Sequence, residues 1–198
     1  MNAFEPLVLI SDEAAYGVDY ALQHNLETLL IHVFRMYLGG VPLNAANVFA
    51  GKIPESEWVV LVSHGLTADN DPEEPTDRMR MGFFVGGTEF ELTPRNIPER
   101  VKLRGRKIMA LGCGNGRAPF GQAFLEAGCP VYIGANESVD QTATQLFASL
   151  FFYHLINPNG TPLPPHGRPS RIYSEREAFE RAASVDDEFG KFRFYARA

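Results

Sequence analysis

The sequence contains few cysteines and no excess of positive charge. Its 198 residues include two cysteines, Cys113 and Cys129, which are too few for a disulfide framework. A single bridge between them stays an alternative, but we expect free thiols in a reducing compartment. The formal net charge of -6 gives no support to a nucleic-acid-binding face, which would need a basic patch. We therefore expect no nucleic-acid partner.

Long hydrophobic runs are also missing. The first six residues contain no basic region followed by an apolar stretch, so we expect no signal peptide. The apolar cluster at residues 146–156 is interrupted by Ser149, Tyr153 and His154 and is too short to span a bilayer. We expect a cytoplasmic protein with no membrane partner. The length suits one domain over residues 1–198.

Short apolar runs alternate with helical patterns along the chain. Buried strands are predicted at residues 6–10, 58–63, 107–111 and 130–134, a β-hairpin at 83–92, and a half-buried strand at 192–196. Helices are predicted at 18–38, 118–127 and 139–156, and after a capping box formed by Ser174 and Glu177. Residues 41–51 are ambiguous and are taken as an irregular link with a short strand at 47–49. The alternation predicts an α/β fold with a mostly parallel sheet covered on both faces.

Two of the predicted strands end in unusual side chains. One runs into Ser63-His64-Gly65 and the other into Gly112-Cys113-Gly114, with Cys113 49 residues after His64. Ligands bind outside the carboxyl ends of strands in open α/β sheets. A thiol attacks as its thiolate, and a nearby imidazole stabilises that form or removes the proton. The pattern therefore predicts a Cys–His catalytic dyad at two neighbouring strand ends.

Residues 108–138 allow a different interpretation, as the glycine-rich loop of a class I S-adenosylmethionine-dependent methyltransferase. Such a fold places this loop after its first strand and needs several more strands and helices afterwards, whereas 82 residues remain after Gly116. Asn136 stands near the place where an acid should bind the ribose, and Ala110 replaces the acid usual before the loop. A short glycine pattern is weak evidence by itself, so the methyltransferase stays an alternative.

Three stretches together resemble the caspase-like cysteine peptidases of clan CD, and among them the CHAT domains and gingipain-type members. The first stretch is residues 59–65, which end in Ser63-His64-Gly65, and the second is the hairpin with Leu-Thr-Pro at 83–94. The third is residues 108–156, where a strand leads into Cys-x-x-Gly and is followed by a helix, a strand and a longer helix. The terminal strand also fits, so the resemblance covers most of the chain. It implies a caspase-like α/β/α sandwich with a mostly parallel central sheet and a small β-hairpin.

The resemblance also implies an acyl-transfer mechanism without a cofactor or a metal ion. Cys113 would be the nucleophile, His64 would protonate the leaving amine, and the backbone amides of Gly65 and Cys113 would hold the oxyanion. A glycine after the histidine would let a substrate carbonyl approach that amide closely. The substrate would be a protein or peptide, and association with a regulatory protein is an additional expectation.

Polar residues beyond the strand at 130–134 are candidates for substrate binding. Asn136, Glu137 and Asp140 follow that strand, and the two acids would suit a basic substrate side chain. CHAT domains usually place a tryptophan near here, where this chain has Ala135-Asn136-Glu137. The acidic segment 69–77 is interpreted as a solvated loop rather than a calcium site. A catalytically inactive, CHAT-like binding module is the alternative to the peptidase.

Overall fold

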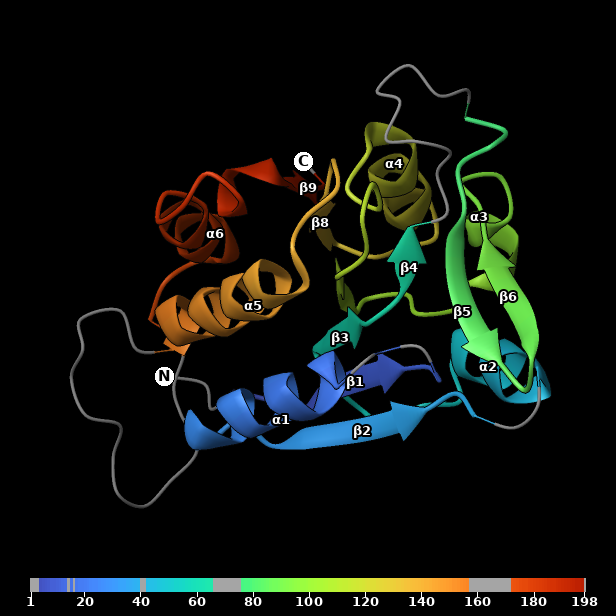
Figure 1. Ribbon diagram of the computed structural model, residues 1–198, viewed down its shortest axis with the longest axis horizontal. Helices are drawn as coiled ribbons and strands as arrows, with labels where there is room; N and C mark the ends of the chain where they lie inside the picture. The colour runs from blue at the N-terminus through green and yellow to red at the C-terminus, as the bar shows by residue number, and fades with distance from the viewer. Residues whose placement is uncertain are drawn as a thin grey trace.

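A six-stranded sheet forms the centre of the protein. The computed structural model describes residues 4–13, 15, 17–39, 42–65, 76–156 and 172–197. The strands lie in the order β2 (Val33–Tyr37), β1 (Leu7–Ser11), β3 (Trp58–Leu61), β7 (Lys107–Ala110), β8 (Val131–Ala135) and β9 (Phe192–Ala196) (Figure 1). All neighbours run parallel except β8 and β9. The predicted α/β class and the mostly parallel sheet are confirmed.

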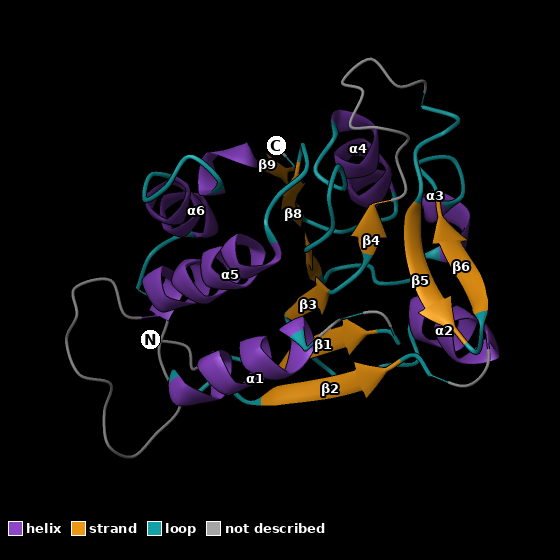
Figure 2. Ribbon diagram, viewed as in Figure 1, coloured by secondary structure: helices purple, strands orange, loops and turns teal. Residues whose placement is uncertain are grey.

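Helices cover both faces of this sheet because its strands are apolar on both sides. In β1, Leu7 and Leu9 point into one core, and Val8 and Ile10 into the other. The first core is closed by α1 (Val18–Thr28), α5 (Gln141–Ile156) and α6 (Glu175–Ala183). The second is closed by α2 (Pro42–Phe49), α3 (Ile97–Arg100), α4 (Ala118–Glu126) and the hairpin, as the two sides of Figure 2 show.

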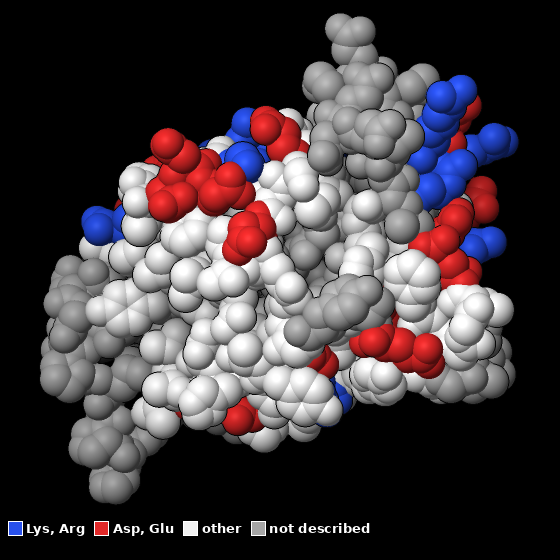
Figure 3. All heavy atoms as spheres, in the orientation of Figure 1, with Lys and Arg blue, Asp and Glu red and all other residues white. Residues whose placement is uncertain are grey.

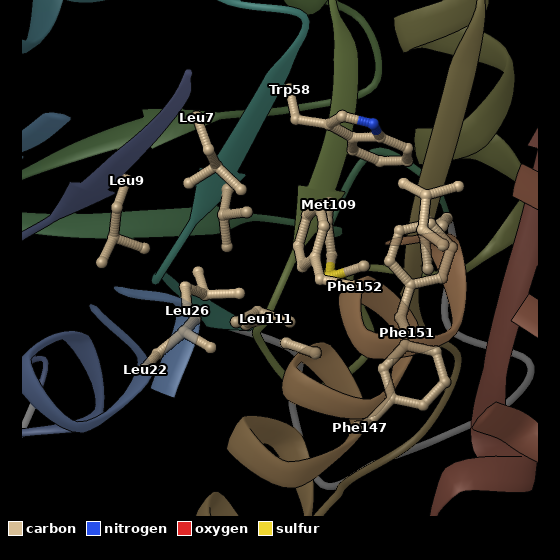
Figure 4. Packing of buried hydrophobic residues seen from close by; sticks show 14 of the residues in the cluster. Leu7, Leu9, Leu22, Leu26, Trp58, Met109, Leu111, Phe147, Phe151 and Phe152 are labelled. Atoms are coloured by element: carbon tan, nitrogen blue, oxygen red, sulfur yellow. The ribbon is translucent and has the colours of Figure 1, made fainter. Parts of the chain in front are cut away.

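Large aromatic side chains fill the core between the sheet and α5. Trp58 of β3 meets Phe151 and Phe152 edge to face, with ring centroids 5.1 and 5.5 Å apart (Figure 4). Leu22 and Leu26 of α1 are fully buried in the same cluster. Burying each such side chain stabilises the fold by roughly 1.5–3 kcal/mol relative to leaving it exposed. This packing holds α1 and α5 against one face of the sheet.

A second, smaller sheet stands beside the main one. It contains β4 (His64–Gly65), β5 (Met81–Val85) and β6 (Thr88–Leu92), all antiparallel. Gly86 and Gly87 link β5 to β6 with φ angles of 58° and 72°, as a tight two-residue turn requires. The predicted hairpin is confirmed, and its pairing with β4 ties it to the end of the central strand β3.

The helix predicted at 18–38 is wrong beyond Thr28, because α1 ends there and residues 33–37 form the edge strand β2. The Leu30 amide donates to the Glu27 carbonyl (2.9 Å) and the Ile31 amide to the Leu26 carbonyl (3.1 Å). These two bonds form a Schellman motif, which usually carries a glycine at its left-handed position. Here Leu30 occupies that position with φ 61°, so the usual stop signal is missing from the sequence.

The link predicted at 41–51, with its short strand at 47–49, is also wrong. Those residues form α2, whose Ala45, Val48 and Phe49 pack under the hairpin. The helix after the capping box is confirmed as α6, since the Ser174 hydroxyl accepts from the Glu177 amide and the Glu177 carboxylate from the Ser174 amide. Residues 157–171, between α5 and α6, lie outside the described residues.

Candidate active site

His64 lies at the carboxyl edge of the sheet, three residues after β3 ends. Together with Gly65 it pairs with β5, His64 opposite Gly82. Its imidazole is 30% exposed and meets the ring of Phe84 edge to face, with centroids 5.3 Å apart. The hairpin therefore supports one side of the imidazole while the ring stays accessible to solvent.

Asp12 lies beside His64, and the sequence patterns did not point to it. It directly follows β1, its carboxylate is fully buried, and Oδ1 is 3.9 Å from Nε2 of His64. The second oxygen, Oδ2, accepts a hydrogen bond from the Phe84 amide at 2.7 Å. Protonated His64 forms an ion pair with this carboxylate, whose position is fixed by the hairpin backbone. One signal in the sequence could have indicated Asp12: it is a polar residue close after a buried strand, like His64 and Cys113.

Cys113 lies in the loop that follows β7. Its thiol is partly exposed; Sγ lies 3.6 Å from the Ser138 hydroxyl, which donates to it, and 3.8 Å from the Val139 carbonyl, to which it donates. The Gly114 amide donates to the Glu137 carbonyl at 3.1 Å, and Gly114 has a φ of 70°. The chain segment after β8 therefore both fastens this loop and supplies polar groups to the sulfur.

The loops that carry His64 and Cys113 touch through their backbones. A Cβ atom on Gly65 would lie 1.4 Å from the Cys113 carbonyl oxygen, and one on Gly112 would lie 2.6 Å from the Ser63 carbonyl oxygen. The Asn115 side-chain amide also donates to the Ser63 hydroxyl at 3.0 Å. Contact within the chain therefore accounts for glycine at position 65, in addition to the substrate approach that we expected.

His64, Gly65 and Cys113 line one cavity of about 260 Å³. They come from the ends of β3 and β7, which are hydrogen-bonded neighbours in the sheet. The other residues that line the cavity come from the same strand ends and from the starts of α1 and α5: Ala15, Val18, Val62, Ser63, Leu111, Gly112, Val139, Gln141 and Thr144. The structure thus brings the three predicted catalytic residues together.

The predicted substrate-binding residues lie elsewhere. Asn136 and Glu137 line a second cavity, of about 820 Å³, together with Arg117 and Lys191. Asp140 caps α5: its Oδ1 accepts from the Thr142 and Ala143 amides at 2.8 and 3.2 Å. These hydrogen bonds, that from Ala143 first, lower the pKa of the Asp140 carboxyl. The structure does not bring these residues into the cavity that holds Cys113.

Lys191 fastens the segment after β8 from the far end of the chain. It belongs to the 3₁₀ turn η1 (Phe189–Lys191). Its ammonium donates to the Ser138 carbonyl at 3.1 Å and pairs with the Glu188 carboxylate. The hydrogen bond to Glu188 raises the pKa of Lys191, and the charges of Glu137 and Cys113 add to that shift. A cation therefore lies close to the Cys113 sulfur without lining its cavity.

Metal-binding chemistry finds no support in the described part of the chain. No three His, Cys, Asp or Glu side chains gather there in a way that could hold a metal ion. Residues 69–75 of the acidic segment lie outside the described residues. Cys129 belongs to the core: its thiol donates to the Leu103 carbonyl at 3.7 Å, and burial raises its pKa to about 12. The thiol of Cys129 is therefore protonated and inert at neutral pH.

Solved structures with the same arrangement identify the fold. The separase of Saccharomyces cerevisiae, in its complex with securin, superimposes with a TM-score of 0.58 at 11% identity over 98% of this chain. Gingipain RgpB of Porphyromonas gingivalis, in the complex of its pro- and mature domains, gives 0.54 at 11% identity over 96%. Both are clan CD proteases. The fold is caspase-like.

The caspase-like fold is the extent of this likeness. This chain spans 12% of the separase chain and 47% of the RgpB chain. No protein-family model matches the sequence, and no curated protein matches it either. The fold also counts against the methyltransferase, because the Gly112–Gly116 loop follows β7, the fourth strand of the main sheet along the chain, and not the first. None of the described helices is long and apolar enough to cross a membrane.

Proposed function

We propose that the protein is a cysteine peptidase, with Cys113 as nucleophile and His64 as general acid and base. The observation that carries the proposal is the shared cavity: a partly exposed thiol and an imidazole line it from adjoining strand ends, and the buried carboxylate of Asp12 lies behind the imidazole. Nucleophile, base and orienting group in this order make the arrangement that acyl transfer needs. The caspase-like fold of separase and RgpB supports it.

In the proposed reaction the Cys113 thiolate attacks the scissile carbonyl carbon. The negative charge that develops on the carbonyl oxygen is held by the backbone amides of Gly65 and Cys113, whose chain segments are in contact. Protonated His64 gives its proton to the leaving amine as the C–N bond breaks, which leaves a thioester on Cys113. Water then attacks the thioester while His64 takes its proton, and the breaking C–S bond releases the acid product and restores the Cys113 thiolate beside protonated His64.

Asp12 acts in this scheme through His64. A fully buried carboxylate 3.9 Å from Nε2 pairs with the imidazolium that forms in the reaction and fixes the orientation of the ring. Ser138 and Lys191 lie on the side of the other partner: the Ser138 hydroxyl donates to the Cys113 sulfur, and the Lys191 ammonium donates to the Ser138 carbonyl. The second cavity, with Asn136 and Glu137, is the place we assign to more distant residues of the peptide.

A regulatory partner is part of the proposal. The separase with the same fold was solved in complex with securin, and RgpB with its pro-domain. On this precedent we expect this protein to associate with a regulatory protein or segment. The free thiols of Cys113 and Cys129 suit a reducing compartment such as the cytoplasm.

The test is a fluorogenic peptide library with wild type, Cys113→Ala and His64→Ala. We expect cleavage by the wild type, and none above background by either variant while their circular dichroism and melting temperatures stay unchanged. Cys129→Ala is the matched thiol control and should cleave at the wild-type rate. Equal traces for wild type and Cys113→Ala would contradict the peptidase and favour the inactive binding module.

A further inference from the structure

The described wall of the cavity beside the candidate dyad carries no charged side chain other than those of the dyad itself. Of its lining residues, His64 and Cys113 belong to the reaction, and the remaining described ones include no Asp, Glu, Lys or Arg. Val18, Val62 and Val139 form much of the apolar lining, and the Thr144 hydroxyl donates to the Asp140 carbonyl of its own helix at 3.0 Å. Among the described lining residues, a charged ligand group inside this cavity would therefore meet no counter-charge apart from that of the catalytic pair itself.

The acids that the structure describes near this edge of the sheet make other contacts. Asp12 holds the Phe84 amide and faces His64, Asp140 caps the first turn of α5, and Glu137 lines the second cavity. The surface in Figure 3 agrees: charged side chains gather over α6 and over α3 and β6, whereas the surface over α5 and most of α1 is largely uncharged. The first turns of α1 and α5 line the cavity.

The size of the cavity limits what it can hold. At about 260 Å³ it is smaller than the range of roughly 300–1,000 Å³ typical of sites for whole drug-sized molecules. His64, Gly65 and Cys113, which would hold the scissile bond, line this cavity, so a single substrate side chain next to that bond is the group that fits it.

We propose that this cavity binds the side chain of the residue that supplies the scissile carbonyl, and that it selects an uncharged aliphatic side chain such as that of valine or leucine. This inference rests on the peptidase function proposed above and names its substrate class. Burial of an aliphatic side chain against apolar walls is favourable, whereas burial of an arginine or aspartate side chain without a partner is costly. The proposed preference for an aliphatic substrate side chain therefore differs from the basic one that Glu137 and Asp140 led us to expect.

The experiment compares four peptides that differ in the residue before the scissile bond: valine, leucine, arginine or aspartate. We expect kcat/KM for the valine and leucine peptides to exceed that for the arginine and aspartate peptides by at least about tenfold. Gln141→Glu adds a carboxylate at the exposed rim of the cavity, on the first turn of α5. It should raise kcat/KM for the arginine peptide relative to leucine by about fivefold or more.

Gln145→Glu is the matched control, because it makes the same change one turn further along α5 at a residue that does not line the cavity. It should leave the arginine-to-leucine ratio at the wild-type value. A wild-type preference for arginine or aspartate that disappears with Cys113→Ala would overturn the aliphatic specificity and leave the peptidase intact. Equal shifts in both glutamate variants would overturn the assignment of the cavity. Failure of every peptide, with wild type equal to Cys113→Ala, would overturn both proposals.

Discussion

Replacement of Asp12 by asparagine tests whether the buried carboxylate supports the imidazole. The side chain keeps its shape, and its carbonyl oxygen can still accept the hydrogen bond from the Phe84 amide. What is lost is a negative charge 3.9 Å from Nε2 of His64. The variant therefore separates the electrostatic role of Asp12 from its structural one.

The expected loss follows from that distance. Two unit charges about 4 Å apart interact by roughly 4 kcal/mol at an effective dielectric constant of about 20. The imidazole is 30% exposed, so screening by water leaves on the order of 1–3 kcal/mol. Since about 1.4 kcal/mol is a tenfold change in rate, kcat/KM should fall roughly 10- to 100-fold. The free energy of unfolding should change by less than about 1 kcal/mol, because the hydrogen bond to the hairpin is kept.

The assay is kcat/KM on the best peptide of the library, with urea unfolding of each variant alongside. Glu13→Gln is the control: it removes a charge from the adjacent residue, whose carboxylate holds the Gly86 amide at 2.9 Å. Glu13→Gln should keep the wild-type kcat/KM. If Asp12→Asn also stays within about twofold of the wild type while Cys113→Ala is inactive, Asp12 has no catalytic role and the electrostatic argument fails.

Four further predictions rest on separate features of the structure. Iodoacetamide at neutral pH should modify Cys113 and leave Cys129 unmodified, as mass spectrometry would show, because Cys129 is buried with a pKa of about 12. In the unfolded chain the Cys129 thiol ionises near pH 9. The free energy of unfolding should therefore fall between about pH 9 and pH 12, and it should fall less in Cys129→Ala. Leu30→Gly should raise the free energy of unfolding in urea by about 0.5 kcal/mol, because it relieves the left-handed backbone at φ 61°, and a decrease would contradict this. Lys191→Met should slow both alkylation of Cys113 and peptide cleavage by about threefold to tenfold; Lys52→Met, whose ammonium bonds to Asn47, should leave both rates unchanged.

Elements with a local signal in the sequence were predictable. The strands at 58–63, 107–111 and 130–134 are apolar on both sides, and each lies in the parallel sheet at or near the expected residues. The Gly86-Gly87 pair predicted the hairpin because a tight turn with positive φ angles has few other solutions. The meeting of His64 and Cys113 followed from the same logic, since neighbouring parallel strands end at one edge.

Features set by contacts between distant segments were not predictable. Spacing of apolar residues could not show that α1 stops at Thr28, because Leu30 accepts a left-handed conformation that the tertiary packing of Leu26 and Ile31 enforces. Asp12 is a candidate for the active site because two distant groups lie against its carboxylate. These are the Phe84 amide, 72 residues away along the chain, and the imidazole of His64, 52 residues away. The position of Glu137 and Asp140 outside the Cys113 cavity likewise depends on contacts that the sequence does not show. Asp140 caps α5, and Lys191, from the end of the chain, holds the segment between them by a hydrogen bond to the Ser138 carbonyl.

The candidate site is built from two halves of the chain, which the pairing of β3 with β7 brings together. Asp12 and His64 come before the exposed turn at Arg104-Gly105, and Cys113 comes after it. A protein cut at this turn would yield two fragments that are each chemically incomplete, one without a nucleophile and one without a base. Their reassembly through β3 and β7 would restore both partners at once, so that this chain could serve as a split reporter whose turnover measures the association of its fragments.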